Sequence, residues 1–306
     1  MSSGPGLFSN FGKKTKDLLK RDCESDQKFS VSTTSVTGVT LTSTATNIGG
    51  ASSGDVRAMY KHKNTLINVK FDAQSNITVT LALKDIVPST KTTASFKLNN
   101  FKSNKISTTL TSTDIFFPST KTIASLELPD FRSGRLDVHY FHHLATLTST
   151  IALKQSPTIN ISATTGTPIF AMGAKIYYEI PSRKFTNFAV GINVNIPDST
   201  ASIVLDDKGE TIRAWYIHYF DRLKKIAVAG EFKRRLKTSK TSFMVGGCYA
   251  FDSQTVVKAK LTNHGKLSVL VKHEIIPKSF ITFSSELDTK ALQKTPKFGL
   301  AVLLKH

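Results

Sequence analysis

Apolar and polar residues alternate along most of the chain with a period of two. In the segment 187–194, every second residue is apolar: Phe188, Val190, Ile192 and Val194. The segments 225–233, 265–272 and 297–305 repeat this alternation. Successive side chains of a strand point to opposite faces, so each segment predicts a β-strand with one apolar and one polar face.

Short clusters of turn-forming residues separate these segments, roughly one per strand or hairpin. They include Asn99-Asn100, Ser133-Gly134 and Asn263-His264-Gly265. The pattern predicts a meander of antiparallel strands that begins near Gln27 and continues to the C-terminal end. About 280 residues at ~10 residues per strand plus turns give on the order of 20 strands.

The N-terminal segment has helical spacing instead. Its apolar residues share one face of a helix: Leu7, Phe8, Phe11, Leu18 and Leu19. Basic residues occupy the rest of that helix: Lys13, Lys14, Lys16, Lys20 and Arg21. We predict an amphipathic helix from about Pro5 to Arg21. The acidic residues Asp17, Asp22 and Glu24 argue against a cleavable mitochondrial presequence, since such peptides are poor in acids.

Composition narrows the classes of protein. The 306 residues include 41 Lys and Arg but 22 Asp and Glu, a formal charge of +19. The cations are mostly scattered singly, which fits a charged inner surface better than a nucleic-acid-binding stripe, so no nucleic acid is expected as partner. We find no stretch long and apolar enough for a transmembrane helix, and expect no secretory signal. With two cysteines, Cys23 and Cys248, and no nucleophile motif, we expect neither cofactor, nor metal, nor enzymatic activity.

Two architectures can bury one face of such a meander. A soluble barrel places the apolar face inside, and a transmembrane barrel places it outside against lipid. A barrel of about 20 strands is too wide for side chains to fill, so its lumen holds water. Lysines on the polar face then line water, whereas in a soluble barrel they would be buried charges. These lysines are Lys258, Lys260, Lys266 and Lys272. The pattern favours a pore, with a soluble β-rich anion-binding protein as the alternative.

Several segments resemble the eukaryotic mitochondrial porins, or voltage-dependent anion channels, and the plant branch in particular. Gly4-Pro5-Gly6-Leu7 is similar to the start of the family's N-terminal helix. Tyr249 to Thr255, followed by Ala259 to Asn263 and Ser268 to Val271, matches the family's signature near its C-terminal end. Lys297, Gly299, Val302 and Leu304 fit the signal by which barrel precursors are inserted into the outer membrane.

The resemblance implies a fold and a function. Residues 1–25 would form a helix inside the pore and residues 26–306 a barrel of 19 strands, an odd number that forces one parallel pair. The protein would lie in the mitochondrial outer membrane as a voltage-gated, weakly anion-selective channel for small metabolites, ATP and ADP included. Its partners would be metabolite anions and nucleotides in transit, outer-membrane lipids and further copies of the chain. A porin-fold paralogue that conducts poorly or serves protein import is the alternative.

An internal repeat bears on the number of strands. PSTKTTASFKLNNFKSNKI, residues 88–106, and PSTKTIASLELPDFRSGRL, residues 118–136, start 30 residues apart and agree at 10 of 19 positions. This is the length of one β-hairpin with its turns. We predict that residues 80–108 are an extra hairpin duplicating 109–136, which gives 21 strands and a pore ~10% wider. The alternative is that neighbouring hairpins resemble each other by composition alone.

Three predictions concern individual residues. The helix residues Lys13, Lys14, Lys16, Lys20 and Arg21, with the four wall lysines named above, would line the pore and attract anions collectively. The repeats carry Lys91 and Lys121 where the family has the lysine of Gly-Leu-Lys, so these two are phosphate-contact candidates. Trp215, next to Tyr216, is predicted to lie in the aromatic girdle at the membrane interface.

Overall fold

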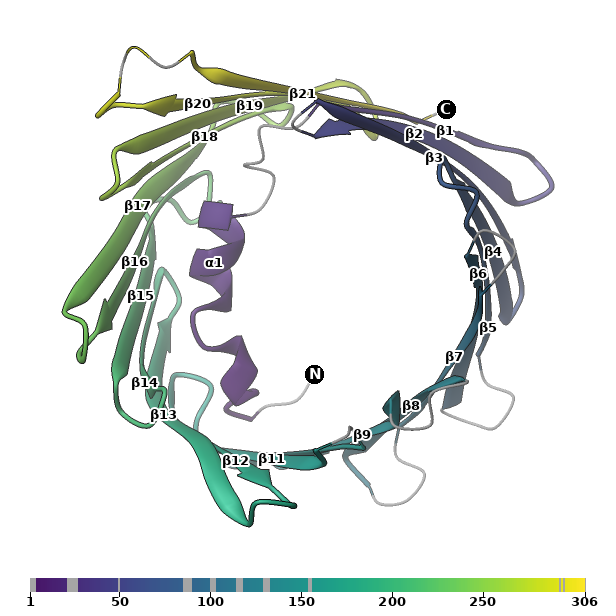
Figure 1. The fold of residues 1–306 in the computed structure, drawn as a ribbon. Coiled ribbons are helices and arrows are strands. Elements are labelled where there is room, and N and C mark those ends of the chain that lie inside the picture. Colours follow the sequence, from purple (N-terminus) through teal and green to yellow (C-terminus); the bar gives the residue numbers. More distant parts are fainter. Residues whose placement is uncertain are drawn as a thin grey trace.

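The chain folds into one closed β-barrel with its N-terminal segment inside the lumen (Figure 1). The structure, a computed structural model, describes residues 4–20, 27–48, 50–84, 90–99, 103–113, 118–128, 133–153, 156–291, 293 and 295–305, without the side chains of 48, 97–99 and 103–105. Cys23 falls outside these residues.

The described residues form 21 strands, which follow one another around the barrel in chain order. Their bounds are β1 (Gln27–Thr34), β2 (Val39–Ile48), β3 (Ala51–His62), β4 (Thr65–Asp72), β5 (Ile77–Lys84), β6 (Thr90–Asn99), β7 (Ser103–Thr113), β8 (Thr120–Leu128), β9 (Arg135–Phe141), β10 (Ala145–Ala152), β11 (Thr158–Gly166), β12 (Phe170–Glu179), β13 (Lys184–Ile196), β14 (Ser199–Asp206), β15 (Thr211–Tyr219), β16 (Ile226–Arg235), β17 (Lys240–Ala250), β18 (Thr255–Thr262), β19 (Lys266–Ile276), β20 (Ser279–Asp288) and β21 (Lys297–Lys305).

The barrel closes through a parallel pair, β1 with β21. Lys28 lies opposite Ala301, and the register continues to Ser32 opposite Lys305. All other neighbouring strands are antiparallel, as consecutive hairpins must be. With an odd number of strands the first and last run in the same direction, so closure requires one parallel seam.

Strands β6 and β7 are full members of the barrel wall. β6 pairs with β5 over its length, from Lys91 opposite Lys84 to Leu98 opposite Ile77. β7 pairs with β6 and β8 in the same antiparallel manner. The prediction of 21 strands is thus confirmed. The family resemblance implied 19 strands, two fewer than the barrel has. That residues 80–108 are an extra hairpin duplicating 109–136 stays a prediction.

The two faces of the wall differ as the alternation predicts. Phe188, Val190 and Ile192 of β13 are each more than 40% exposed on the outer face. The residues between them point to the lumen, where Ala189 is covered by the N-terminal segment. The apolar face is therefore outside, as in a transmembrane barrel and contrary to a soluble one.

The N-terminal segment contains less helix than predicted. It contains a 3-10 turn, η1 (Phe8–Asn10), and an eight-residue α-helix, α1 (Lys13–Lys20), rather than one helix from Pro5 to Arg21. The break lies at Phe11, which is extended, and Gly12, whose φ of +69° favours glycine. Among the described residues, we find no helix that combines the length and apolarity needed to cross a membrane.

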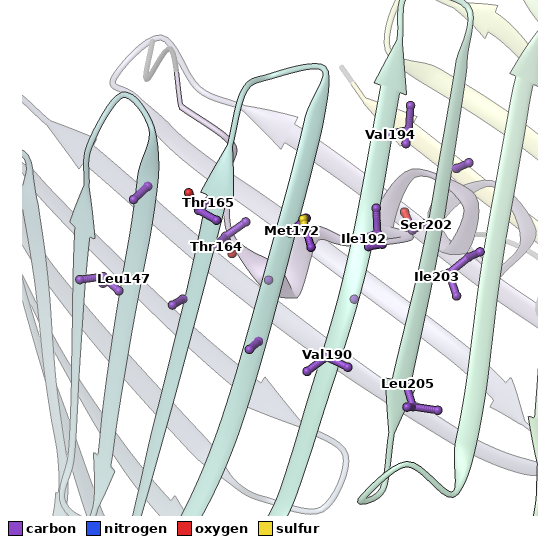
Figure 2. A pocket seen from close by; sticks show the side chains of 16 residues that line it. Leu147, Thr164, Thr165, Met172, Val190, Ile192, Val194, Ser202, Ile203 and Leu205 are labelled. Carbon is purple, nitrogen blue, oxygen red and sulfur yellow. The ribbon is translucent and has the colours of Figure 1, made fainter.

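The outer wall carries one large apolar hollow over β10 to β14, behind the N-terminal segment (Figure 2). Its volume is about 730 Å³. Small residues on adjacent strands, such as Ala163, Ala174 and Ala201, leave the backbone uncovered, and Leu147 and Ile203 lie among the larger side chains around them. The hollow opens away from the lumen, and Gly173 and Ser202, which line it, also lie beneath the N-terminal segment on the other side of the wall.

Candidate functional site

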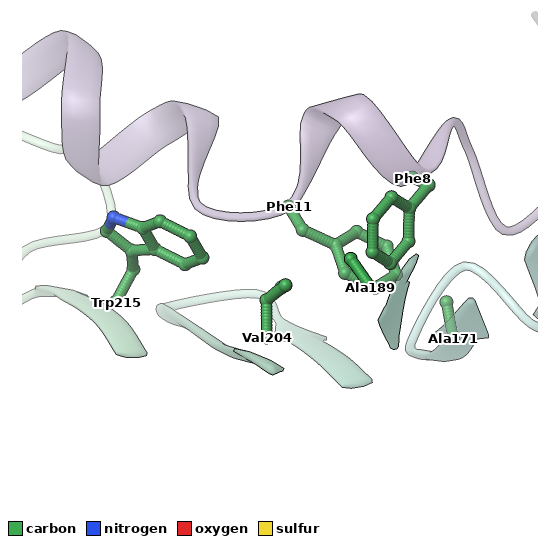
Figure 3. Close-up of a cluster of buried hydrophobic side chains, with 6 residues drawn as sticks. All are labelled: Phe8, Phe11, Ala171, Ala189, Val204 and Trp215. Atoms are coloured by element: carbon green, nitrogen blue, oxygen red, sulfur yellow. The ribbon is translucent and has the colours of Figure 1, made fainter. Parts of the chain in front are cut away.

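The lumen is the candidate site, and the N-terminal segment is fixed to one side of it. Phe8 and Phe11 pack against Ala171, Ala189, Val204 and Trp215 from β12 to β15 (Figure 3). Further along, Leu19 of α1 packs against Ile217 and Ala229, and all three are at most 1% exposed. These two clusters form what we call the helix seat.

Glycines of the wall make room for the large side chains of this segment. A Cβ atom on Gly173 would lie 2.6 Å from Cδ2 of Phe8, and one on Gly246 would lie 2.7 Å from Cδ2 of Leu19. A Cβ on Gly191 would lie 3.4 Å from Cδ2 of Phe11. Real Cβ atoms essentially never lie within 3 Å of another heavy atom, so the helix seat depends on glycine at Gly173 and Gly246.

A hydrogen-bonded chain fixes the start of α1. The backbone N–H of Gly12 donates to Oγ of Ser202 at 3.1 Å, and Oγ of Ser202 donates to Oδ1 of Asn193 at 2.7 Å. The first N–H groups of a helix have no partner within it. Here the barrel wall supplies the missing hydrogen-bond partner. Ser202, which is 2% exposed, lies directly under the start of the helix.

Three of the predicted helix lysines contact the wall. Nζ of Lys14 donates to Oδ1 of Asn195 at 2.7 Å, and Nζ of Lys16 lies 4.2 Å from the ring centroid of Trp215. Lys20 forms an ion pair with Glu231, with 2.9 Å between Nζ and Oε2. Lys13 is exposed to the open lumen. The prediction for Arg21 falls outside the described residues.

Burial against the wall lowers the pKa of Lys16, and nearby Glu231 acts in the opposite direction. The pKa of Lys14 is also lowered, first by burial and then by the charge of Lys224. Proximity to the wall therefore makes these two ammonium groups easier to deprotonate than ordinary lysines.

The four wall lysines all face the lumen, on β18 and β19. Lys260 lies opposite Gly246 and Ser268, on the face that holds Leu19. Lys258 shares that face, two residues along β18. Nζ of Lys266 lies 3.4 Å from Oε1 of Glu286, and Nζ of Lys272 lies 4.2 Å from the ring centroid of Phe280.

The two phosphate-contact candidates also face the lumen, on the opposite arc. Lys91 lies opposite Thr111, and Lys121 lies opposite Thr113 and His139. They are separated from α1 by the open lumen (Figure 1). The structure therefore does not bring them together with the helix lysines.

Trp215 is not a membrane-girdle residue, contrary to our prediction. It is 4% exposed and points into the lumen, where it contacts Gly12 and Lys16. Its neighbour Tyr216, which is 51% exposed, lies on the outer face instead. The alternation in the sequence already indicated that Trp215 faces the lumen. Arg213 shares the face of Trp215, and a charged residue in the middle of a strand indicates the lumen side.

The sequence analysis missed other residues of the seat. Ser202, Glu231 and the seat glycines look like ordinary polar-face residues until the position of the helix is known. Only the register across β14, β16 and β17 places them beneath α1. No local sequence signal identifies them.

An apolar exterior, a lumen lined with charged residues and a helix fixed to one side define the class: this is a transmembrane β-barrel pore. Comparison with known proteins gives the family. The model of the eukaryotic porins matches residues 4–105 and 101–299. The chain belongs to the eukaryotic porin family.

Similar plant proteins support this over the whole chain. Mitochondrial outer membrane protein porin 2 of Arabidopsis thaliana is 47% identical over 305 residues, which span all of both chains. Mitochondrial outer membrane protein porin 5 of Oryza sativa subsp. japonica is 42% identical over 302 residues, 99% of this chain and 98% of its own. The outer plastidial membrane protein porin of Pisum sativum is 35% identical over the full length of both chains. The protein is thus a mitochondrial outer-membrane channel through which small metabolites diffuse.

Proposed function

We propose that this channel is weakly anion-selective and closes at high voltage. One observation supports anion selectivity: the lysines of the helix and those of the wall on β18 and β19 face the same lumen. Fixed cations along a water-filled path raise the local concentration of anions. The ion pair of Lys20 with Glu231 offsets part of this charge, so a weak preference is expected.

The proposal covers the solutes and surroundings as well. Metabolite anions and nucleotides would be favoured in transit, because their charge is opposite to that of the lumen. Outer-membrane lipids would surround the apolar face. Association with further copies of the chain, expected from the family resemblance, is part of the same proposal, and crosslinking in membranes tests it.

The test is a reversal-potential measurement on single channels in a planar bilayer with a potassium chloride gradient. The wild-type channel should favour chloride. The triple variant Lys13→Glu, Lys14→Glu, Lys16→Glu should shift the reversal potential toward cations, because six units of charge change beside the conduction path.

The matched control reverses three lysines in turns between strands: Lys63, Lys208 and Lys278. The control should shift the reversal potential much less, since these side chains lie outside the lumen and are screened by salt. Equal shifts in both variants would contradict the role of the helix lysines. A protein that inserts but never opens would favour the import-type or poorly conducting paralogue.

A further inference from the structure

One arginine departs from the alternation that places charged residues in the lumen. Arg234, the last but one residue of β16, lies opposite Ile212 of β15 and Thr241 of β17. Ile212 in turn lies opposite Leu205, and Leu205 lies opposite Val190, which is exposed on the outer face. Arg234 therefore points outward. Among the strand residues whose side chains are described, it is the one Lys, Arg, Asp or Glu that the register places there.

The surroundings of Arg234 match the boundary between lipid chains and headgroups. Phe232 precedes it on the same face of β16, and Phe243 lies opposite Phe232 on β17; both are exposed. Leu236, exposed as well, follows in the turn of residues 236–239 that joins the two strands. An arginine at the end of a lipid-facing strand directs its guanidinium to the headgroups while its stem covers apolar surface, and its cost there is small.

No described residue pairs with the guanidinium of Arg234. Its side chain forms neither an ion pair nor a hydrogen bond within the described parts of the chain. Carboxylates of the neighbouring strands and turns have other partners: Asp206 pairs with Arg213 at 3.2 Å, and Glu210 pairs with Lys237. The N–H donors of Arg234 are thus left for a ligand that reaches them from the membrane.

The groups around Arg234 favour an anion as that ligand. Thr241, its register partner on β17, is exposed and carries a hydroxyl donor. Arg235 and Lys240, the next register pair toward the rim, are also exposed and form no ion pair with a described residue. Their charges raise the local concentration of anions. A guanidinium binds phosphate oxygens through two parallel hydrogen bonds, which a lysine cannot do.

We propose that Arg234 binds the phosphate of an anionic phospholipid headgroup, and that a phosphate monoester such as that of phosphatidic acid binds best. The acyl chains of this lipid would contact Phe232 and Phe243. The ligand comes from the membrane because Arg234 lies on the face that the lumen does not reach. The site rests on the proposed lipid surroundings of the apolar face and gives them one defined headgroup contact.

The test uses a tryptophan reporter beside the site and lipids with brominated acyl chains, which quench tryptophan on contact. The reporter Phe232→Trp is introduced into the full-length protein, which is reconstituted in phosphatidylcholine vesicles. Trp215 is 4% exposed in the lumen, so acyl chains do not reach it. Quenching by brominated phosphatidic acid and by brominated phosphatidylcholine gives the relative binding of the two lipids. We expect a preference of about fivefold for phosphatidic acid, which Arg234→Gln should reduce to below about twofold.

The chain offers two matched controls. Arg235→Gln removes the same charge one residue further along β16, from the face that points to the lumen, and should keep most of the preference because salt screens its charge. A second reporter, Phe188→Trp on the outer face of β13, should show no preference, since no outward cation lies on that strand. Arg234→Lys keeps the charge without the planar donor group, so it should retain part of the preference even if Arg234→Gln fails to insert.

Three results would overturn the site. They are equal preferences at both reporters, equal losses in Arg234→Gln and Arg235→Gln, and loss of the preference when inorganic phosphate is added at constant ionic strength. The last of these would show that the site takes the free ion rather than a lipid. Brominated lipids that quench neither reporter would instead overturn the proposed lipid contact of the outer face.

Discussion

Gly12 has two independent reasons to lack a side chain. Its φ of +69° is a backbone conformation that other residues adopt with strain. In addition, a Cβ atom there would lie 2.3 Å from Cδ2 of Trp215. One residue therefore sets both the break between η1 and α1 and the contact of the segment with the wall.

The variant Gly12→Ala should release the helix from its seat. The strained backbone costs about 1–3 kcal/mol, and the collision with Trp215 adds to it. The measurement is the rate of tryptic cleavage at the helix lysines in the membrane-embedded protein, which should rise.

Gly6→Ala provides the matched control. Gly6 has a similar φ of +78°, but nothing lies within 4 Å of its Cβ position. It should raise the cleavage rate less than Gly12→Ala does. Similar rates in both variants would show that Trp215 contributes nothing to holding the helix.

At the scale of elements, the described part of the helix combines apolar anchors with one ion pair, that of Lys20 with Glu231. Exposed ion pairs contribute about 0–1 kcal/mol, whereas burial of a side chain such as Leu19 contributes about 1.5–3 kcal/mol. The apolar contacts of Phe8, Phe11 and Leu19 therefore hold the segment, and the pair of Lys20 with Glu231 mainly sets the local charge.

This difference predicts the effect of Glu231→Gln. The variant removes a carboxylate from the lumen and leaves the charge of Lys20 without its partner, so the reversal potential should shift toward greater anion preference. The helix should remain seated, with unchanged tryptic cleavage. Glu210→Gln is the control, because Glu210 pairs with Lys237 at a turn outside the lumen; a shift as large there would argue against a local effect.

The sequence predicted elements better than it predicted their contacts. Alternation alone assigns β13 or β21 to a strand and identifies its lipid-facing side, because the membrane imposes a period of two. It does not show which lumen residues lie beneath the helix, since Ala189 and Ser202 satisfy the alternation wherever the helix lies. The bounds of the N-terminal helix were predicted wrongly for a related reason. Phe8 and Leu19 share a helical spacing, but the break at Gly12 depends on Trp215, which is distant in the chain.

For the whole molecule, the number of strands was the open question. Periodicity gave about 20 strands, and only the repeat distinguished 21 from 19. Parity matters more than the number itself, because adding one whole hairpin keeps β1 and β21 parallel. The insertion also lies away from the helix seat, so the barrel widens on its open side without disturbing the contacts of α1.

Deletion of residues 88–117 should therefore yield a closed barrel of 19 strands. The remaining turn before β8 carries the same Pro-Ser-Thr-Lys sequence, and β5 and β8 run antiparallel as required. Diameter grows roughly with strand number, so the open conductance should fall by about a fifth. Unchanged single-channel conductance would contradict this account of the pore.

Deletion of residues 199–225 is the comparison. It also removes two strands, β14 and β15, but with them Ser202 and Trp215. This variant should narrow the pore and also expose the helix lysines to trypsin. The first deletion should leave tryptic cleavage unchanged.

The parallel seam also determines the order in which the molecule can be assembled. Every other pairing joins consecutive segments and can form as soon as both have been delivered, but β1 waits for β21, the last strand of the chain. Until then the sheet has two edges whose backbone groups lack partners, a state that lipid does not tolerate. Whatever inserts this protein must shield both edges of a nearly complete sheet and release them together, so the nine residues of β21 close the barrel last.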